Sequence, residues 1–277
     1  MIKSVSVVIG LGGIGEAISR HIGFGGVLLL ADNNPALLAR AADRLTQAGR
    51  EVETQVVDVT DVESLQALAS TAQALGAVKH VVNTAGLSPN MAGPQKVLAV
   101  DLVGAAMVFE VFEAVIAQNA TGLVISSMAG HMLPELPEDV QHALAFTPAQ
   151  DLSALPCLAE DAVPDSMVAY CLSKKANHLR VQAAALVWGE KGGRVNSISP
   201  GIIATPLAQH ELASDIGDGY RAFIDASPSK RMASPDEVAV LAEFLLSEKA
   251  SFFTGSDILM DGGVIAAIKA GRVQMPG

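Results

Sequence analysis

The sequence places a tyrosine and a lysine four residues apart, in the run Tyr170-Cys171-Leu172-Ser173-Lys174. The segment that contains them predicts a helix, and residues four apart on a helix project from one face. A nearby ammonium favours the ionised form of a phenol, so Lys174 would lower the pKa of Tyr170 toward the range useful for proton exchange with an alcohol or carbonyl. Ordinary amphipathic helices also contain this spacing. Whether the pair is catalytic or only part of an amphipathic helix therefore depends on the elements that would position it.

A glycine-rich run, Gly10-Leu11-Gly12-Gly13-Ile14-Gly15, follows an apolar run at 5–9 and precedes a helix-forming segment. Glycines in a strand-turn-helix context let the backbone approach a pyrophosphate, which the amide groups of the helix N-terminus then bind. A glycine turn without a ligand is the less favoured interpretation, because glycines are costly in an ordered chain. The run therefore predicts a dinucleotide site.

An acidic residue, Asp32, ends the second apolar run at 27–30 and lies 22 residues after Gly10. A carboxylate there accepts hydrogen bonds from the ribose hydroxyls of the adenosine and repels a 2′-phosphate. The glycine run and the residues directly after Asp32 contain no Arg or Lys. We therefore expect NAD rather than NADP. Alternatively, Asp32 only caps the helix that begins near Pro35, a role that Asn33 or Asn34 could also fill.

Strand and helix patterns alternate along the chain with short connections, which predicts an α/β fold with a doubly wound, seven-stranded parallel sheet between two helix layers. The predicted strands lie at 5–9, 27–30, 51–57, 80–82, 122–126, 194–198 and 257–260, and the predicted helices include 36–48, 62–75, about 95–118 and 235–246. Polar residues follow the carboxyl ends of three strands, where such sheets bind ligands. These are Asp58, the run Asn83-Thr84-Ala85-Gly86, and Ser127. For the first two, spacing alone favours an ordinary loop role equally.

The composition excludes several classes of protein. The net charge of −11 argues against nucleic acid and anionic membranes as partners. The two cysteines, Cys157 and Cys171, indicate neither a disulfide framework nor a metal site, and they favour a reducing cytoplasm. The apolar N-terminal run is short and interrupted by glycines, so we expect no signal peptide or membrane span.

Together these features resemble the short-chain dehydrogenase/reductase family over essentially the whole chain, including the run Ser199–Pro206 (S-P-G-I-I-A-T-P) and the terminal T-G-S-D-I-L-M-D-G-G. The resemblance implies one Rossmann-fold domain spanning 1–277. It also implies that Ser127 orients the substrate oxygen, that Tyr170 is the acid/base, and that Lys174 binds the nicotinamide ribose and lowers the tyrosine pKa.

The resemblance also implies a set of cofactor contacts. Thr205 would hold the nicotinamide carboxamide, and Pro200 and Gly201 would shape its pocket. The full set for NAD is Gly10, Gly12, Gly13, Ile14, Gly15, Asp32, Asp58, Val59, Asn83, Ala85, Gly86, Tyr170, Lys174, Pro200, Gly201, Ile203 and Thr205.

Two departures from the family pattern concern the site. The glycine loop is one residue shorter than usual and opens with Ile9-Gly10 rather than with Thr. Asp101 occupies the position where the family's fourth helix usually carries a catalytic Asn. By the resemblance, that residue seats a relay water partly through its backbone carbonyl, so Asp101 is expected to remain compatible with catalysis while adding a negative charge near Lys174.

The third departure is an insertion at 131–165, because Ser127 and Tyr170 lie 43 residues apart, far more than is usual in the family. The segments 138–146 and 149–155 predict short helices, the second with Thr147 as N-cap and Pro148 at its first position. We therefore expect a helical subdomain rather than a disordered loop. The insertion, the run W-G-E-K-G-G-R-V-N-S-I-S-P-G-I-I-A-T-P-L and the tail after Gly263 resemble bacterial 3α-hydroxysteroid dehydrogenase/carbonyl reductase-like members.

The insertion gives the prediction for the substrate. It is rich in acids (Glu135, Glu138, Asp139, Asp151, Glu160, Asp161 and Asp165), and the chain has no Lys or Arg from 97 to 173. A negative lid would repel anions. The apolar residues in and beside it could line a cleft for a neutral substrate: Met128, Met132, Leu133, Leu136, Leu144 and Phe146. Equally, these residues could pack the insertion on the main domain and leave its acids solvated.

The sequence thus predicts an NAD-dependent enzyme that transfers hydride between the cofactor and a small, neutral, apolar secondary alcohol or ketone, with hydroxysteroids as one possible class. The alternatives are a 3-oxoacyl-thioester reductase and, from another class, a non-catalytic NAD-binding regulator or scaffold. The resemblance also implies a homodimer or homotetramer formed through the fourth and fifth helices, and an insertion beside the fifth helix could block one of these modes.

Overall fold

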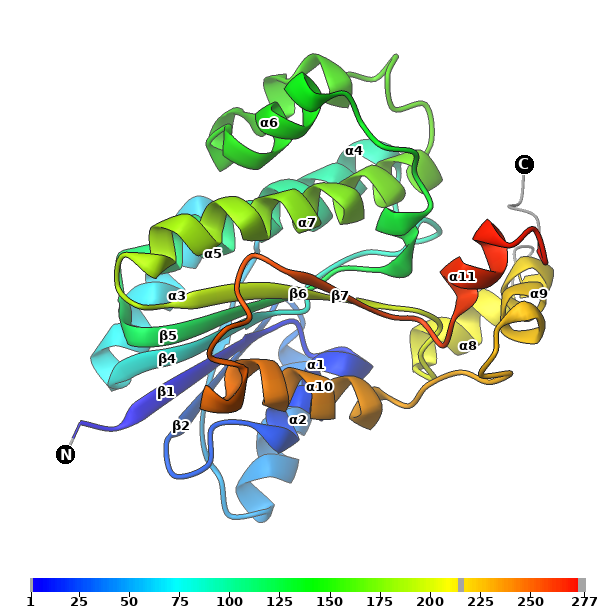
Figure 1. The fold of residues 1–277 in the computed structure, drawn as a ribbon. Helices are drawn as coiled ribbons and strands as arrows, with labels where there is room; N and C mark the ends of the chain where they lie inside the picture. The colour runs from blue at the N-terminus through cyan, green and yellow to red at the C-terminus, as the bar shows by residue number, and fades with distance from the viewer. Residues whose placement is uncertain (1, 214–216, 274–277) are drawn as a thin grey trace.

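A seven-stranded parallel sheet forms the centre of the molecule (Figure 1), and the computed structural model describes residues 2–213 and 217–273 of the chain. Its strand order is β3-β2-β1-β4-β5-β6-β7. The strands are β1 (Ser4–Ile9), β2 (Val27–Asp32), β3 (Glu51–Val56), β4 (Ala77–Asn83), β5 (Ile116–Ile125), β6 (Arg194–Pro200) and β7 (Asp257–Met260). The predicted doubly wound fold is confirmed, and the order reverses between β1 and β4, where such sheets bind ligands. The first residue and the last four of the predicted domain lie outside the described residues.

Two helix layers cover the sheet (Figure 1). Helices α1 (Gly13–His21), α2 (Pro35–Gln47) and α10 (Pro235–Leu246) lie on one face, and α3 (Val62–Leu75), α4 (Pro94–Leu98), α5 (Ala105–Glu113) and α7 (Ser166–Gly189) on the other. Successive residues of β1 point to opposite faces: Val7 and Ile9 join the core under α3, α5 and α7, whereas Val8 joins the core under α1 and α10. The sheet is therefore buried on both sides, as its unbroken apolar strands predict.

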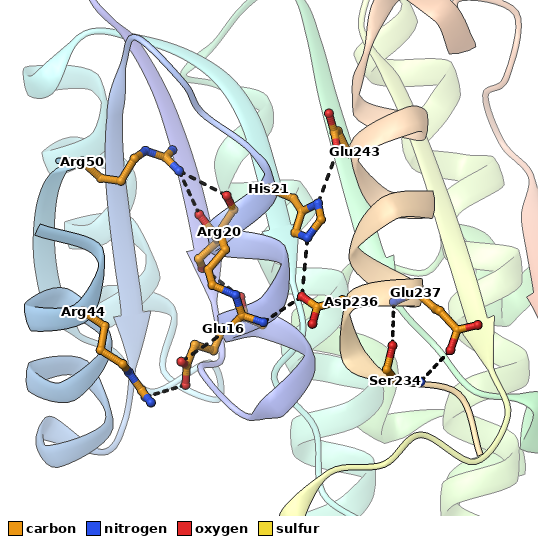
Figure 2. A network of polar contacts seen from close by, with 11 residues as sticks. Glu16, Arg20, His21, Arg44, Arg50, Ser234, Asp236, Glu237 and Glu243 are labelled. Carbon is orange, nitrogen blue, oxygen red and sulfur yellow. Dashed lines mark hydrogen bonds and ion pairs between the residues drawn. The ribbon is translucent and has the colours of Figure 1, made fainter. Parts of the chain in front are cut away.

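Polar side chains link α1, α2 and α10 at the surface (Figure 2). Arg20 of α1 pairs with Asp236 of α10 at 2.8 Å, and Arg44 of α2 pairs with Glu16 of α1 at 2.7 Å. Helix α10 begins with a capping box between Ser234 and Glu237. Exposed pairs of this kind add little stability individually. They link α1, whose N-terminus carries the glycine loop, to α10 and α2.

The predicted helix at 95–118 is wrong in two respects. Helices α4 and α5 are joined by a π-helical segment, η1 (Ala99–Gly104), and α5 ends at Glu113, so that β5 begins at Ile116. The register between β4 and β5 shifts where β5 contains Asn119, at φ 58°. The apolar periodicity of the segment continues into this irregular strand, which explains the overrun. The π turn holds Asp101, and π turns are frequent at functional sites.

The insertion contains α6 (Glu138–Phe146), at the predicted bounds, and two 3-10 helices, η3 (Ala149–Ala154) and η4 (Pro156–Leu158). The predicted capping of the second helix is wrong. Pro148 is the N-cap of η3, and Thr147 is the C-cap of α6. The Ala149 amide instead donates to the Glu110 carboxylate of α5, at 3.0 and 3.1 Å. A side chain remote in sequence thus replaces the local cap.

The insertion packs on α5 and α7 rather than covering the site. Leu144 is fully buried in the main core, and Phe146 is 51% exposed. The largely buried guanidinium of Arg180 pairs with Glu110 and donates to the Thr147 carbonyl. All seven acids of the insertion are exposed. The packing interpretation is therefore favoured for this segment over the lid interpretation.

The carboxyl ends of the strands face a group of short helices: α8 (Pro206–Leu212), α9 (Gly217–Ala226) and α11 (Val264–Lys269), which lie together at one end of the sheet (Figure 1). A last 3-10 turn, η5 (Glu248–Ala250), precedes β7. Among the described helices, none has both the length and the apolar character needed to span a bilayer.

Candidate active site

Helix α7 presents Tyr170 and Lys174 on one face, as predicted. The helix is capped by Asp165, whose carboxylate accepts from the amides of Met167 and Val168, both at 2.9 Å. One turn after Tyr170, the ammonium of Lys174 lies 5.3 Å from the tyrosine ring centroid and is 4% exposed. The pair therefore forms one local group rather than a surface lysine beside a packed tyrosine.

Ser127 completes this group from the sheet. It follows β5 and caps the 3-10 helix η2 (Met128–His131), whose Ala129 amide donates to its hydroxyl at 3.1 Å. Ser127 and Tyr170 both line one cavity. Gly130 allows η2 to lie this close to α7, since a Cβ there would lie 2.8 Å from the Lys174 carbonyl carbon. The structure thus brings together the three residues predicted to act on the substrate.

The pKa of Tyr170 is raised above its ordinary value, mainly because of burial. Lys174 and the hydrogen bond from Ser127 lower it, and the charges of Asp101 and Glu211 raise it. The predicted direction of the Lys174 effect is confirmed. Burial of the phenol, which the sequence does not show, outweighs this effect.

Asp101 forms a buried ion pair with Lys174, with Oδ2 and Nζ 2.9 Å apart. Its Oδ1 accepts from the Leu87 amide at 2.8 Å, and its backbone carbonyl accepts from Asn177 at 3.1 Å. Burial alone would lower the pKa of Lys174, but Asp101 and then Tyr170 more than offset it, so the pKa is raised. Lys174 is accordingly held as a cation.

The glycine loop fits a pyrophosphate. Gly10 has φ +87° and lies against Thr84, and a Cβ on Gly15 would lie 1.9 Å from the Gly10 carbonyl oxygen. A Cβ on Gly12, in contrast, would have no described atom within 4 Å, so this glycine faces open space at the N-terminus of α1. Gly13 lies against Thr205. The shortened loop therefore keeps both a tight turn and an open cradle of amides.

Asp32 lies at the end of β2 and binds the glycine loop rather than capping α2. Its Oδ2 accepts from the Leu11 amide at 2.6 Å and its Oδ1 from the Asn34 amide at 2.8 Å. Asn34 is the cap, accepting from Ala36 and Leu37. Asp32 is therefore fixed beside the loop by two backbone donors.

The residues after β3 and β4 differ in what they offer. Asp58 is exposed and holds the amide and hydroxyl of Thr60, which lowers its pKa, and Val59 is buried. Asn83 accepts from the Ala85 amide at 3.1 Å, and its buried Nδ2 has no hydrogen-bond partner among the described residues. Such an orphaned donor at the sheet edge fits a ligand acceptor.

The segment after β6, residues 201–208, is held by contacts with neighbouring loops and with the start of α8. Gly201 lies against the backbone of Asp261, and Ile203 bridges to Ala233. Thr205 is buried, and its hydroxyl accepts from the Ala208 amide at 3.2 Å at the start of α8. The loop is thus fixed at both ends.

A cavity of about 540 Å³ lies between α7, η2, and the segments that follow β4 and β6. Of the predicted residues, it is lined by Ile14, Gly86, Ser127, Tyr170, Lys174, Pro200, Gly201, Ile203 and Thr205. Gly10, Gly12, Gly13, Gly15, Asp32, Asp58, Val59, Asn83, Ala85 and Asp101 lie outside this lining. Met128 and Met132 line the cavity as predicted, whereas Leu133, Leu136, Leu144 and Phe146 do not, since Met132 is the only described residue of the insertion in its wall.

Sequence reasoning missed two groups. Glu211 of α8 and Tyr220 of α9 line the cavity opposite the sheet. The only available signal was their place after the S-P-G-I-I-A-T-P run, because neither residue belongs to a motif.

The second missed group is a buried polar network beneath Lys174. His178 contacts the hydroxyls of Ser126 and Ser199 at 3.1 and 2.8 Å, and burial, as the largest cause, lowers its pKa to about 4. Asp257 accepts from Ser199 and contacts His131 at 2.7 Å. The ligand atoms of His131, His178 and Asp257 lie within 4.8 Å of one another, and these are residue types that could hold a metal ion. Hydrogen bonds among the described residues satisfy them without one.

Two family models match successive parts of the chain. Residues 3–138 match the family model described as short chain dehydrogenase, and residues 154–265 match the one described as enoyl-(acyl carrier protein) reductase. The chain is 42% identical over 267 residues to the short-chain dehydrogenase/reductase bsc3 of Alternaria brassicicola, covering 96% of this chain and 97% of that protein.

The predicted likeness to a bacterial subgroup is also found. The 3-alpha-hydroxysteroid dehydrogenase/carbonyl reductase of Comamonas testosteroni is 31% identical over 192 residues, 68% of this chain and 73% of that protein. A solved structure of 7 alpha-hydroxysteroid dehydrogenase complexed with NADH and 7-oxo glycochenodeoxycholic acid shares the fold, with a TM-score of 0.74 at 24% identity over 94% of this chain and 93% of that one. The chain therefore belongs to the short-chain dehydrogenase/reductase family of oxidoreductases.

Proposed function

We propose that this protein is an NAD-dependent oxidoreductase that interconverts a neutral secondary alcohol and the corresponding ketone. The observation that carries the proposal is that Ser127, Tyr170 and Lys174 together line one wall of a largely apolar cavity. An alcohol or carbonyl oxygen placed between the two hydroxyls could exchange a proton with Tyr170 while Ser127 fixes its orientation.

The cofactor would occupy the sheet edge. The open cradle at Gly12 suits its pyrophosphate, Asp32 its adenosine ribose, and the orphaned amide of Asn83 an acceptor of the ligand. When bound, NAD supplies the hydride acceptor and NADH the hydride donor. Ile14 and Thr205 line the cavity where the nicotinamide would meet the substrate.

The chain's own residues handle the proton. Lys174, held as a cation by Asp101, stabilises the tyrosinate that forms when Tyr170 releases its proton. Burial opposes that ionisation. The balance between the buried phenol and the fixed ammonium would therefore set the pH at which alcohol oxidation becomes fast.

NAD is proposed over NADP because of Asp32. Its carboxylate is held beside the glycine loop by two amide donors, which keeps a negative charge where a 2′-phosphate would lie. The negative charge of Asp32 is thus held in place by hydrogen bonds to the backbone.

The cavity supports a neutral substrate, with hydroxysteroids as one class to be tried. Met128, Met132, Met167 and Phe223 contribute apolar walls, and the volume lies in the range of roughly 300–1,000 Å³ usual for small-molecule sites. A 3-oxoacyl-thioester reductase is less supported, because the cavity wall carries a carboxylate, Glu211, and no described cation except Lys174. A non-catalytic NAD-binding regulator would not need Ser127, Tyr170 and Lys174 together.

The test is the initial rate, followed by nicotinamide absorbance, with NAD and with NADP. The panel holds neutral secondary alcohols, 3-hydroxysteroids and 3-hydroxyacyl thioesters. We expect turnover of the neutral alcohols with a preference for NAD. Turnover of the thioesters alone, or NAD binding without turnover of any class, would reject the proposal.

We also propose a homodimer in the cytoplasm. The described edge of the sheet at β7 and the neighbouring α10 expose a group of large apolar side chains: Val240, Phe244, Phe252, Phe253 and Leu259. Such a face favours association with a second copy. The insertion covers part of α5 and α7, where the alternative tetramer contact would form. Light scattering of the wild type and of Val240→Asp would test this assembly.

The unpaired Cys157 and Cys171 support a reducing compartment.

A further inference from the structure

The outer wall of the cavity carries a buried carboxylate. Glu211 is 5% exposed and lines the cavity from α8, and Tyr220 on α9 lines the same cavity. Burial, and then the charge of Glu211 and hydrogen bonding to it, raise the pKa of Tyr220. The charge of Glu211 also acts on Tyr170, since it is one of the charges that raise the pKa of that residue. The catalytic hydroxyl and this carboxylate therefore share one cavity.

A second polar group faces the same space. Ser88, which follows β4, is 5% exposed and lines the cavity, and its hydroxyl has no hydrogen-bond partner among the described residues. Much of the remaining substrate wall is apolar: Leu87, Pro89, Met128, Met132, Met167, Cys171, Leu207, Ala208 and Phe223. A hydroxyl enclosed in an apolar wall, as that of Ser88 is, is costly unless something completes its hydrogen bonds.

We propose that Glu211, positioned by Tyr220, is a subsite for a second hydroxyl group of the substrate, so that the preferred substrate is a neutral alcohol or ketone with a hydroxyl remote from the reacting carbon. The inference rests on the proposed function and specifies its substrate class. Glu211 binds but does not react. Tyr220 is a positioning residue.

The chemistry of a carboxylate determines which groups fit. An ionised carboxylate only accepts hydrogen bonds, and each of its oxygens can accept more than one, so it can keep Tyr220 and take a substrate hydroxyl as well. A charge-assisted bond of this kind is stronger than a neutral one. The same charge repels carboxylate, phosphate or sulfate on the substrate. Exclusion of anions thus follows from a residue in the cavity rather than from the exposed acids of the insertion.

The contrast between Glu211 and a purely structural carboxylate is testable through selectivity. A structural role would make the loss of Glu211 reduce activity on every substrate in proportion. A subsite role would reduce activity only on substrates that carry the second hydroxyl. With an apolar residue in place of Glu211, that hydroxyl loses its acceptor, whereas a substrate without it no longer has to desolvate the carboxylate.

The experiment measures kcat/KM with NAD for matched alcohols that differ only by a second hydroxyl. The pairs are cyclohexanol with cyclohexane-1,4-diol, and a 3-hydroxysteroid with and without a 17-hydroxyl. The proteins are the wild type, Glu211→Leu, Glu211→Gln and Tyr220→Phe. NADH binding by fluorescence and the thermal midpoint report on folding and on the cofactor site.

We expect the wild type to prefer the diol of at least one pair. In Glu211→Leu, the diol/mono-ol ratio of kcat/KM should fall by roughly tenfold or more, with unchanged NADH binding. Glu211→Gln, which keeps an acceptor, should show a smaller fall and move the midpoint of the pH–rate profile to lower pH, because one charge that raises the Tyr170 pKa is removed. Tyr220→Phe should lower the ratio less than Glu211→Leu.

Two results separate the failure of this inference from that of the proposed function. An unchanged ratio in Glu211→Leu, with both alcohols still turned over, would overturn the subsite and leave the oxidoreductase proposal intact. A wild type that binds NADH but oxidises none of the alcohols would remove the proposed function and the subsite together.

Discussion

Asp101 Oδ2 lies 2.9 Å from Lys174 Nζ, and both side chains are almost completely buried. The π-helical turn η1 brings the carboxylate to this position, and the Leu87 amide holds its other oxygen. The family pattern has an uncharged Asn here. In this chain Lys174 therefore has a fixed anionic partner in addition to the neighbouring Tyr170.

The first prediction concerns Asp101→Asn. Asn can still accept from the Leu87 amide, but the charge that raises the pKa of both Lys174 and Tyr170 is lost. As long as Lys174 stays protonated, the ionisation of Tyr170 becomes easier, so the rising limb of the pH–rate profile for alcohol oxidation should move to lower pH by roughly one pH unit. The buried ammonium loses its partner, so the free energy of unfolding should fall by about 1–3 kcal/mol. A limb that stays in place or moves to higher pH would contradict this account.

Asp32 gives a prediction on cofactor choice. Asp32→Asn keeps an acceptor for the Leu11 amide but removes the charge beside the ribose site. The NADP/NAD ratio of kcat/KM should rise by roughly tenfold, equivalent to about 1.4 kcal/mol. Asn34→Ala is the matched control in the same loop, because it removes only the helix cap and should lower stability without changing the ratio. Equal ratios in wild type and Asp32→Asn would show that the carboxylate does not select the cofactor.

Arg180 tests the role of the insertion. The Arg180→Met substitution removes the pair with Glu110 and the bond to the Thr147 carbonyl, so the free energy of unfolding should fall by about 2–4 kcal/mol. Lys3→Met, which breaks the exposed pair with Glu51, should change it by less than about 1 kcal/mol. Since Met132 is the only described residue of the insertion that lines the cavity, kcat/KM of Arg180→Met should remain near the wild-type value below its melting transition. A large loss of kcat/KM in a folded variant would mean that the insertion shapes the site.

We expect the fold to lose stability in acid because of two buried histidines, His80 and His178. Burial lowers the pKa of each to about 4, below the ordinary value near 6.5. The unfolded chain therefore binds more protons between pH 6.5 and 4, and stability should be lost as the pH falls through that window. Each residue should contribute about 2 kcal/mol of that loss by pH 5.

Urea unfolding at pH 7 and pH 5 measures this effect. In His80→Asn the difference in stability between the two pH values should shrink, because Asn does not titrate in this range. Asn also retains a donor toward Thr121, so the contact itself is kept. It should stay the same in His142→Asn, which changes an exposed histidine. If both variants keep the full wild-type difference, His80 does not contribute to acid sensitivity.

Much of the fold was predictable because local and global signals agree. Helices α3, α6 and α10 and strand β7 have the predicted bounds, since caps, prolines and apolar runs mark their ends in the sequence. The prediction failed where a remote residue decides the local structure. Glu110 caps η3 in place of Thr147, and the end of α5 depends on an irregular pairing of β5 with β4.

The candidate site divides in the same way. Ser127, Tyr170 and Lys174 could be predicted, because strand-end position and helical spacing are written in the sequence. Glu211 and His178 could not, because their environments arise from packing between elements distant in the chain. The sign of the Tyr170 pKa shift was likewise hidden, since burial outweighs the neighbouring ammonium.

The central claim is that Tyr170 transfers the proton, and Tyr170→Phe tests it most directly. The substitution removes one hydroxyl and keeps the ring beside Lys174. We expect kcat for NAD-dependent alcohol oxidation to fall by roughly 10²–10⁴-fold, while NADH binding stays close to the wild-type value. A Tyr170→Phe protein that binds NADH and retains more than about a tenth of the wild-type kcat would contradict the account, because another group would then have to move the proton.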